Sequence, residues 1–220
     1  LPRTGSTNLM RALNCHPALR LCNEPFNGDS GSIEGLGPVN GAAALDAGLE
    51  RIWVGHNGIK HVWDSGGWPF TTSRLNRRLL LHSAGRVIFL TRRNLLQQVV
   101  SNELTFQTRF YNHWQGPARD RPIEFTYRNL NEKRLRHCLR AWPRAAAKFR
   151  RKLLRSDLRT HLLEYEEVFG PDKDLAMRRD RLERVLEFLG LGLSDGGVDR
   201  QRVDELLDPA KMTEPGLGGG

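Results

Sequence analysis

The sequence of 220 residues has few cysteines and no long apolar run. Its three cysteines, Cys15, Cys22 and Cys138, include no C-x-x-C pair, which argues against a zinc site. Their odd number argues against a full disulfide framework, although a single bridge stays open. No stretch reaches the roughly 18 apolar residues that a membrane span requires. No signal peptide is visible in the first residues.

Acidic residues are outnumbered by basic ones. Lys and Arg number 34, Asp and Glu 25, and the net charge is +9. Such a balance favours anionic partners: nucleotides, nucleic acid, acidic or sulfated acceptors, or membrane surfaces. Many of the charges lie in residues 134–159, which we interpret as a solvated helix face and not as a binding stripe. The apolar content of 39% suffices for one core, so we expect one domain over residues 1–210 and a glycine-rich tail over 211–220.

Strands and helices alternate along the predicted pattern, which indicates an α/β fold with helices flanking a parallel sheet. The continuous apolar run at residues 86–91 predicts a buried parallel strand. Further strands are predicted near residues 19–22, 58–63 and 158–165. Helices are predicted over residues 6–15, 42–50, 94–110, 131–154 (kinked or split at Pro143), 175–189 (ended by Gly190) and 199–207. Residues 1–5 resemble the tail of a strand, so we expect a truncated first strand and a fragment of a longer chain.

The first candidate anion site is the loop from Pro2 to Asn8, between a strand end and a helix start. A helix start presents free backbone N–H groups and the positive end of the helix dipole. Gly5 allows close approach of the backbone to an anion, and the neighbouring hydroxyls add donors. The loop is not a Walker A motif, because Ser6 and not Lys follows the glycine; the basic residue, Arg3, precedes it. An ordinary turn with Ser and Thr caps is the alternative.

The second candidate anion site again joins a strand to a helix. Arg92 and Arg93 follow the predicted strand at residues 86–91, at the end where open α/β sheets bind ligands. Ser101 comes eight residues after Arg93, a little over two helical turns, so it is predicted to return to the same face. A guanidinium and a hydroxyl together suit a phosphate monoester. Surface ion pairs for the arginines and a plain helical role for Ser101 are the alternative.

Together the two loops resemble the sulfotransferases that use 3'-phosphoadenosine-5'-phosphosulfate (PAPS) as donor. Residues 2–7 match the family's loop for the 5'-phosphosulfate, and Arg93 to Ser101 match its segment for the 3'-phosphate. The first loop, together with His16-Pro17 and Glu24 after it, is most similar to the tyrosylprotein and bacterial trehalose-type branches. Weaker family features are a strand that ends in Tyr165-Glu166 and a helix that finishes at residues 188–190.

The resemblance implies a P-loop-like fold and transfer of a sulfuryl group from PAPS to an acceptor hydroxyl. It implies Glu24 as general base, with His61 as the competing base, and Arg3 as the group that stabilises the departing phosphate. Tyr165 is expected either to contact the nucleotide or to be a core aromatic. The expected donor-binding residues are Arg3, Thr4, Gly5, Ser6, Thr7 and Asn8 for the 5'-phosphosulfate, and Arg93 and Ser101 for the 3'-phosphate.

The acceptor class stays open among sugars, peptide tyrosines, lipids and small metabolites. We expect PAPS as co-substrate and its product 3',5'-ADP (PAP), no metal, no nucleic-acid partner, and either a monomer or a homodimer. A cytoplasmic location is expected, or the Golgi lumen if an N-terminal anchor precedes these residues. Two other functions compete: a P-loop-type kinase, which lacks its glycine–lysine pair here, and a non-catalytic polyanion-binding module, which leaves the two loops unexplained.

Overall fold

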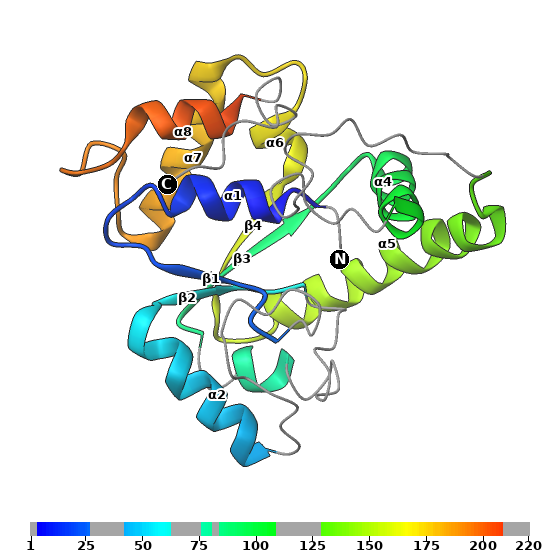
Figure 1. Ribbon diagram of the computed structural model, residues 1–220, viewed down its shortest axis with the longest axis horizontal. Coiled ribbons are helices and arrows are strands. Elements are labelled where there is room, and N and C mark those ends of the chain that lie inside the picture. The colour runs from blue at the N-terminus through cyan, green and yellow to red at the C-terminus, as the bar shows by residue number, and fades with distance from the viewer. Residues whose placement is uncertain (1–3, 27–41, 63–75, 81–83, 109–128, 209–220) are drawn as a thin grey trace.

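The computed structural model describes residues 4–26, 42–62, 76–80, 84–108 and 129–208, and every structural statement below concerns these residues. The fold is mixed α/β (Figure 1). The elements with assigned bounds are α1 (Ser6–Leu13), β1 (Leu21–Asn23), α2 (Ala42–Gly55), β2 (Gly58–Lys60), β3 (Arg86–Thr91), α4 (Leu95–Thr108), α5 (Glu132–Leu154), β4 (Arg159–Glu164), α6 (Tyr165–Phe169), α7 (Leu175–Leu189) and α8 (Arg200–Leu207).

The strands form two parallel pairs. β1 pairs with β2, from Leu21 opposite Gly58 to Asn23 opposite Lys60, and β3 pairs with β4 over six residues of each. The predicted parallel arrangement is therefore confirmed within the described residues, as two small sheets. Figure 1 places α1, α7 and α8 above the strands and α2 and α5 below them. The carboxyl ends of parallel strands are where open α/β sheets bind ligands, and the second candidate loop begins at such an end, after β3.

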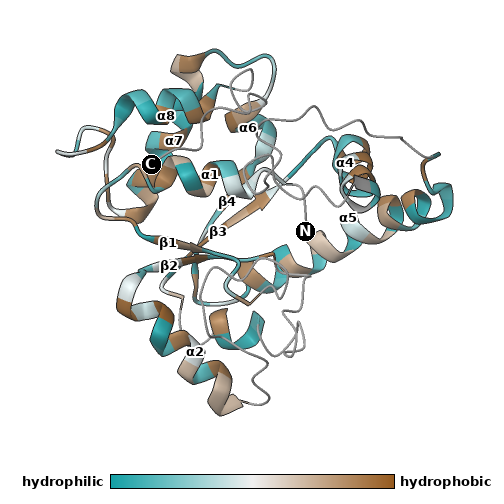
Figure 2. Ribbon diagram, in the orientation of Figure 1, coloured by the Kyte–Doolittle hydropathy of each residue, from teal (hydrophilic) through white to brown (hydrophobic). Residues whose placement is uncertain are grey.

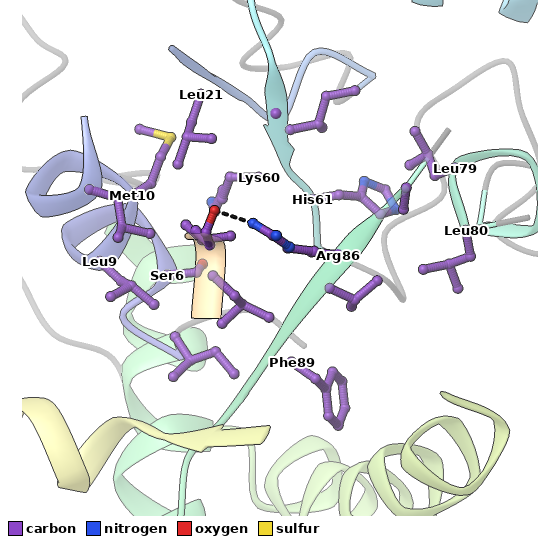
Figure 3. A pocket seen from close by; sticks show the side chains of 18 of the residues that line it. Ser6, Leu9, Met10, Leu21, Lys60, His61, Leu79, Leu80, Arg86 and Phe89 are labelled. Atoms are coloured by element: carbon purple, nitrogen blue, oxygen red, sulfur yellow. Dashed lines mark hydrogen bonds between the residues drawn. The ribbon is translucent and has the colours of Figure 1, made fainter. Parts of the chain in front are cut away.

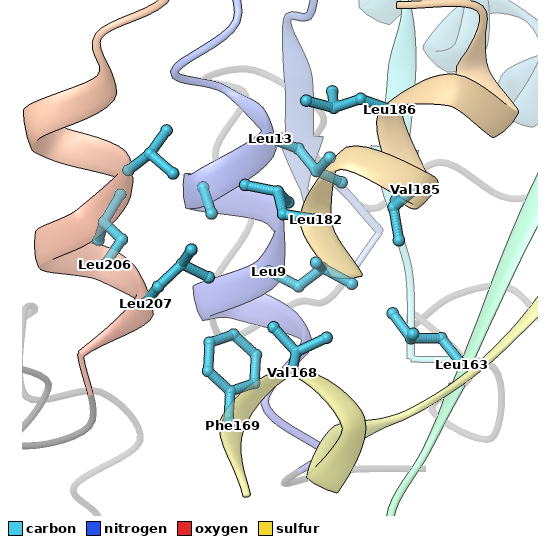
Figure 4. Packing of buried hydrophobic residues seen from close by; sticks show 12 residues of the cluster. Leu9, Leu13, Leu163, Val168, Phe169, Leu182, Val185, Leu186, Leu206 and Leu207 are labelled. Carbon is cyan, nitrogen blue, oxygen red and sulfur yellow. The ribbon is translucent and has the colours of Figure 1, made fainter. Parts of the chain in front are cut away.

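The main core lies between α1, α6, α7, α8 and β4 (Figure 4). Leu182 and Val185 of α7, Val168 of α6 and Leu207 of α8 are completely buried. Their spacing places apolar side chains on one face of each helix, as the hydropathy colouring of Figure 2 also shows. A smaller cluster joins β1 to α2 through Cys22, Phe26, Leu45, Leu49 and Ile52. The main core fixes α1, and with it the first loop.

Several predicted boundaries are wrong. α5 is one continuous helix that contains Pro143, so the proline does not split it. α2 runs five residues further than predicted, to Gly55, and β2 ends at Lys60 instead of residue 63. The short helix α6, directly after β4, was not predicted. Cys15, Cys22 and Cys138 are all free thiols, which removes the single bridge left open by their number.

Candidate functional site

The first loop turns into α1 at Gly5, which has a left-handed backbone with φ 79°. A Cβ at this position would lie 2.4 Å from two ring carbons of Tyr165. Glycine is therefore required here twice, for its backbone conformation and for the close approach of the ring. Thr4, just before it, is buried. Arg3, the predicted partner of the leaving phosphate, lies outside the described residues.

The start of α1 has no side-chain cap among the described residues. The amides of Asn8 and Leu9 are the first to bond back, both to the carbonyl of Gly5, at 3.1 and 3.2 Å. Ser6 and Thr7 thus occupy the first two helical positions, where the helix dipole favours an anion. This is the local geometry that the sequence predicts for the loop.

Three side chains meet beside this helix start. The ammonium of Lys60, at the end of β2, donates to Thr7 Oγ1 at 3.2 Å and forms an ion pair with Glu24, which follows β1. The side chains of Lys60 and Glu24 are only 9% and 16% exposed. The predicted general base is therefore held next to the first loop by a cation from the neighbouring strand.

The backbone of Glu24 has φ 43°, and among the described residues it is the one non-glycine residue with positive φ. Its amide donates to the carbonyl of Lys60 at 2.8 Å, which extends the β1–β2 pairing by one bond and fixes the turn. A left-handed conformation costs a side-chain-bearing residue about 1–2 kcal/mol. Such strain concentrates at functional sites, where the surrounding contacts impose it.

His61, the competing base, directly follows β2. Its Nε2 donates to Asn76 Oδ1 at 3.1 Å when the ring is neutral. Burial lowers the pKa of His61 to about 4, although the bond to Asn76 and the charge of Glu24 both act to raise it. A neutral imidazole whose Nε2 proton is engaged by Asn76 is poorly matched to a base role at neutral pH.

The second loop is held by carboxylates of the chain itself. The guanidinium of Arg93 bonds to Glu164 Oε2, at 3.0 Å from Nε and 2.5 Å from the second nitrogen. The amides of Arg93 and Asn94 donate to the two carboxylate oxygens of Glu166, at 2.9 and 2.8 Å, at the start of α4. The side chain of Arg93 is therefore paired with Glu164, and the common face predicted for Arg93 and Ser101 stays a prediction.

Tyr165 joins the two loops. One side of its ring packs against Gly5, and the guanidinium of Arg92 lies 4.4 Å from the ring centroid. Burial raises the pKa of Tyr165, while the charge of Arg92 acts to lower it. The ring also packs on Phe169 of α6, with centroids 5.1 Å apart. Tyr165 is thus a core aromatic whose ring also contacts both candidate loops, through Gly5 and Arg92.

A cavity of about 520 Å³ lies beside the first loop and borders Thr4, Ser6 and Lys60 (Figure 3). β2 and β3, which are not paired with each other, supply Ile59 and Lys60 on one side and Val87 and Phe89 on the other. Ser6 of α1 lines it together with apolar residues of the same helix. The cavity therefore lies between the two parallel pairs and is mostly apolar, with Lys60 and the start of α1 at its polar side.

Lys60 was missed as a site residue in the sequence analysis. A lysine at the carboxyl end of a parallel strand would have been a signal, but the strand was predicted to continue to residue 63, whereas β2 ends at Lys60. Within the described part of the chain, no three His, Cys, Asp or Glu side chains gather as metal ligands would. No helix in that part is long and apolar enough to cross a bilayer.

Comparisons with protein-family models, with curated proteins and with solved structures find no match for this chain. The chemistry of the site therefore has to be argued from its own residues.

Proposed function

We propose that the chain is a PAPS-dependent sulfotransferase that sulfates an acceptor hydroxyl. The observation on which the proposal depends is the contact of Lys60 with both Thr7 and Glu24. The nearly buried ammonium connects the first loop to the carboxylate of Glu24, whose backbone has a positive φ. A cation between a helix start and a general base suits transfer of an anionic group to a hydroxyl. No metal-ligand cluster is needed for this chemistry.

The residues present fit the donor at its sulfate end. The backbone amides at the start of α1, the hydroxyl of Thr7 and the ammonium of Lys60 offer donors to the oxygens of a phosphosulfate. The space left by the missing side chain of Gly5 is occupied by the ring of Tyr165, so the donors to the anion are those of the helix start, Thr7 and Lys60. We place Arg3 beside the bridging oxygen by resemblance alone.

The residues fit the other end of the donor less completely. Arg92 and Arg93 supply positive charge, and Tyr165 links them to the first loop. Glu164 and Glu166, however, occupy the side chain of Arg93 and the amides at the start of α4. A 3'-phosphate would have to displace Glu164 from Arg93. The two side chains are 69% and 41% exposed, and exposed pairs of this kind contribute little to stability, so Glu164 is readily displaced.

Glu24 accepts the proton of the acceptor hydroxyl at a carboxylate oxygen. When bound, PAPS supplies the sulfuryl group, whose sulfur gains a bond to the acceptor oxygen and loses its bond to the bridging phosphate oxygen, which keeps the electron pair. Lys60 fixes the side chains of Glu24 and Thr7 relative to each other, and its positive charge neutralises that of the Glu24 carboxylate. The fixed positions of these groups supply orientation, which contributes strongly to catalysis between bound partners.

The finer fold assignment, a P-loop-like sheet, belongs to the same proposal. One further parallel strand between β2 and β3 would join the two pairs into a single five-stranded sheet. The cavity lined by both strands provides the space, and its apolar lining suits a strand buried on both faces. Such a strand would lead directly into Thr4, which also lines the cavity.

Calorimetric titration with 3',5'-ADP, 5'-AMP and ATP tests the proposal. We expect 3',5'-ADP to bind at least about tenfold more tightly than 5'-AMP, because one charge-assisted hydrogen bond contributes about 1.5–3 kcal/mol. Equal affinity for the two would contradict the proposal. Tighter binding of ATP that depends on magnesium would instead favour the kinase alternative.

A further inference from the structure

The excess positive charge of the chain is concentrated on α5 and the turn after it. Residues 132–159 contain eleven Lys and Arg and two Asp and Glu, a net charge of +9, which equals that of the whole chain. The remaining sequence therefore has 23 basic and 23 acidic residues. A charge needed only for solubility would be spread over the surface.

Six of these cations form what we call the basic ridge. Spacings of three, four or seven residues put them on one helix face. All six are exposed, and none takes part in an ion pair within the described part of the chain. The ridge extends over about 33 Å, from 22 steps of 1.5 Å. Its members are Lys133, Arg140, Arg144, Lys148, Arg151 and Arg155.

Several basic residues elsewhere on the surface are paired with carboxylates. Arg179 pairs with Asp204, and Arg184 pairs with Asp180. The ridge, in contrast, has no acidic residue among residues 133–156. Cations in such a row repel one another, and an anionic partner would relieve that repulsion.

The opposite face of α5 is packed against the body of the protein. Leu153 and Cys138 are buried, and the ring of Phe149 lies 5.5 Å from that of Phe89 in β3. The apolar face of α5 is therefore not available for insertion into a bilayer, which an interfacial helix requires. Figure 2 shows the two faces of this helix in contrasting colours.

The side chains along the ridge also argue against recognition of nucleic acid. α5 contains no Ser, Thr, Asn or Gln, the residues that read base edges alongside Arg. Its aromatic residues, Trp142 and Phe149, are half-buried on the other face and offer no exposed platform for stacking bases. The ridge thus offers charge and guanidinium geometry alone.

In place of the solvated helix face inferred from the sequence for residues 134–159, we propose that the basic ridge of α5 binds a linear sulfated polysaccharide. Guanidinium groups form paired hydrogen bonds with sulfate and carboxylate oxygens, and a row of them suits a flexible chain with anionic groups along its length. This surface lies outside the residues assigned to the nucleotide. Its function does not require the proposed sulfotransferase activity.

The test compares two variants with equal loss of charge. The ridge variant is R140Q/R144Q/K148Q/R151Q, and the control is R20Q/R77Q/R184Q/R200Q, whose residues are exposed elsewhere on the protein. Heparin-derived dodecasaccharide, single-stranded and duplex DNA, and vesicles of phosphatidylcholine and phosphatidylserine in equal parts serve as probes. Thermal unfolding establishes that each variant is folded.

We expect the ridge variant to bind the dodecasaccharide at least about tenfold more weakly than wild type and control. The slope of the logarithm of the binding constant against the logarithm of the salt concentration should become less steep by about 0.7 for each lost contact. Binding of 3',5'-ADP should be the same in all three proteins, which separates this test from that of the proposed function. Equal loss in ridge and control variants would overturn the proposal. So would tighter binding of DNA or of vesicles than of the dodecasaccharide.

Discussion

Replacing Gly5 by alanine tests the contact between the two loops. The left-handed backbone at φ 79° costs alanine about 1–2 kcal/mol. The new Cβ would meet the Tyr165 ring at 2.4 Å, so the ring must move. Moving it weakens the contact with Arg92, which contributes about 0.5–1 kcal/mol, and forces an off-rotamer side chain at about 0.5–1.5 kcal/mol. We expect a total loss of about 2–4.5 kcal/mol in the free energy of unfolding.

Gly190 provides the matched control. It has nearly the same backbone, φ 77°, but a Cβ there would meet only the end of the Arg86 side chain, at 3.3 Å. Gly190→Ala should therefore cost the backbone contribution alone, about 1–2 kcal/mol. Urea unfolding measures both, and Gly5→Ala in a Tyr165→Leu background should recover about 1–2 kcal/mol of the difference. Equal costs for Gly5→Ala and Gly190→Ala would refute the packing argument.

Three further expectations concern the site, and one the fold. Glu24→Gln should retain 3',5'-ADP binding and lose turnover in a sulfate-transfer assay; normal turnover would pass the base role to His61. Arg93→Ala should weaken 3',5'-ADP binding by about tenfold while sparing 5'-AMP, measured by calorimetry, because one charged hydrogen bond is lost. Burial lowers the pKa of His61 from 6.5 to about 4, so the folded protein favours the neutral ring. The free energy of unfolding should therefore be lower by about 3 kcal/mol at pH 4 than above pH 6.5. An equal loss at acid pH in His61→Gln would contradict this expectation. A short strand of Val and Ile added before residue 1 should raise the melting temperature, whereas one interrupted by proline should not.

Local sequence signals predicted most of the elements that a single segment determines. The continuous apolar run gave β3 its correct bounds, and the glycine at position 190 ends α7 in the left-handed conformation typical of a helix end. The predicted split at Pro143 was wrong because the expectation that proline interrupts a helix considers only the local chain. The apolar face of α5 packs through Phe149 and Leu153, and this tertiary packing outweighs the hydrogen bond that proline removes.

The site was predictable only as far as its strand ends. Gly5 and Glu24 could be identified from loop chemistry and from resemblance. Lys60 could not, because its partners lie 36 and 53 residues away in sequence and depend on the register of β1 against β2. The pairing of Arg93 with Glu164 likewise depends on β3 and β4 lying side by side.

The two loops differ in how far they are prepared for an anion. At the first loop, Lys60 and Glu24 are nearly buried, and Lys60 contacts both Glu24 and Thr7. In the proposed function, the site for the sulfate end of the donor is therefore formed before the donor binds. At the second loop, Arg93 is exposed and held by Glu164, so a 3'-phosphate would replace a carboxylate of the chain. The exposed Arg93–Glu164 pair opposes this exchange only weakly, so the stronger bond from Arg93 to the phosphate is a net gain. Discrimination of 3',5'-ADP from 5'-AMP must then arise from the second negative charge of a phosphate monoester, and it should weaken as pH falls below about 6, where that charge is lost.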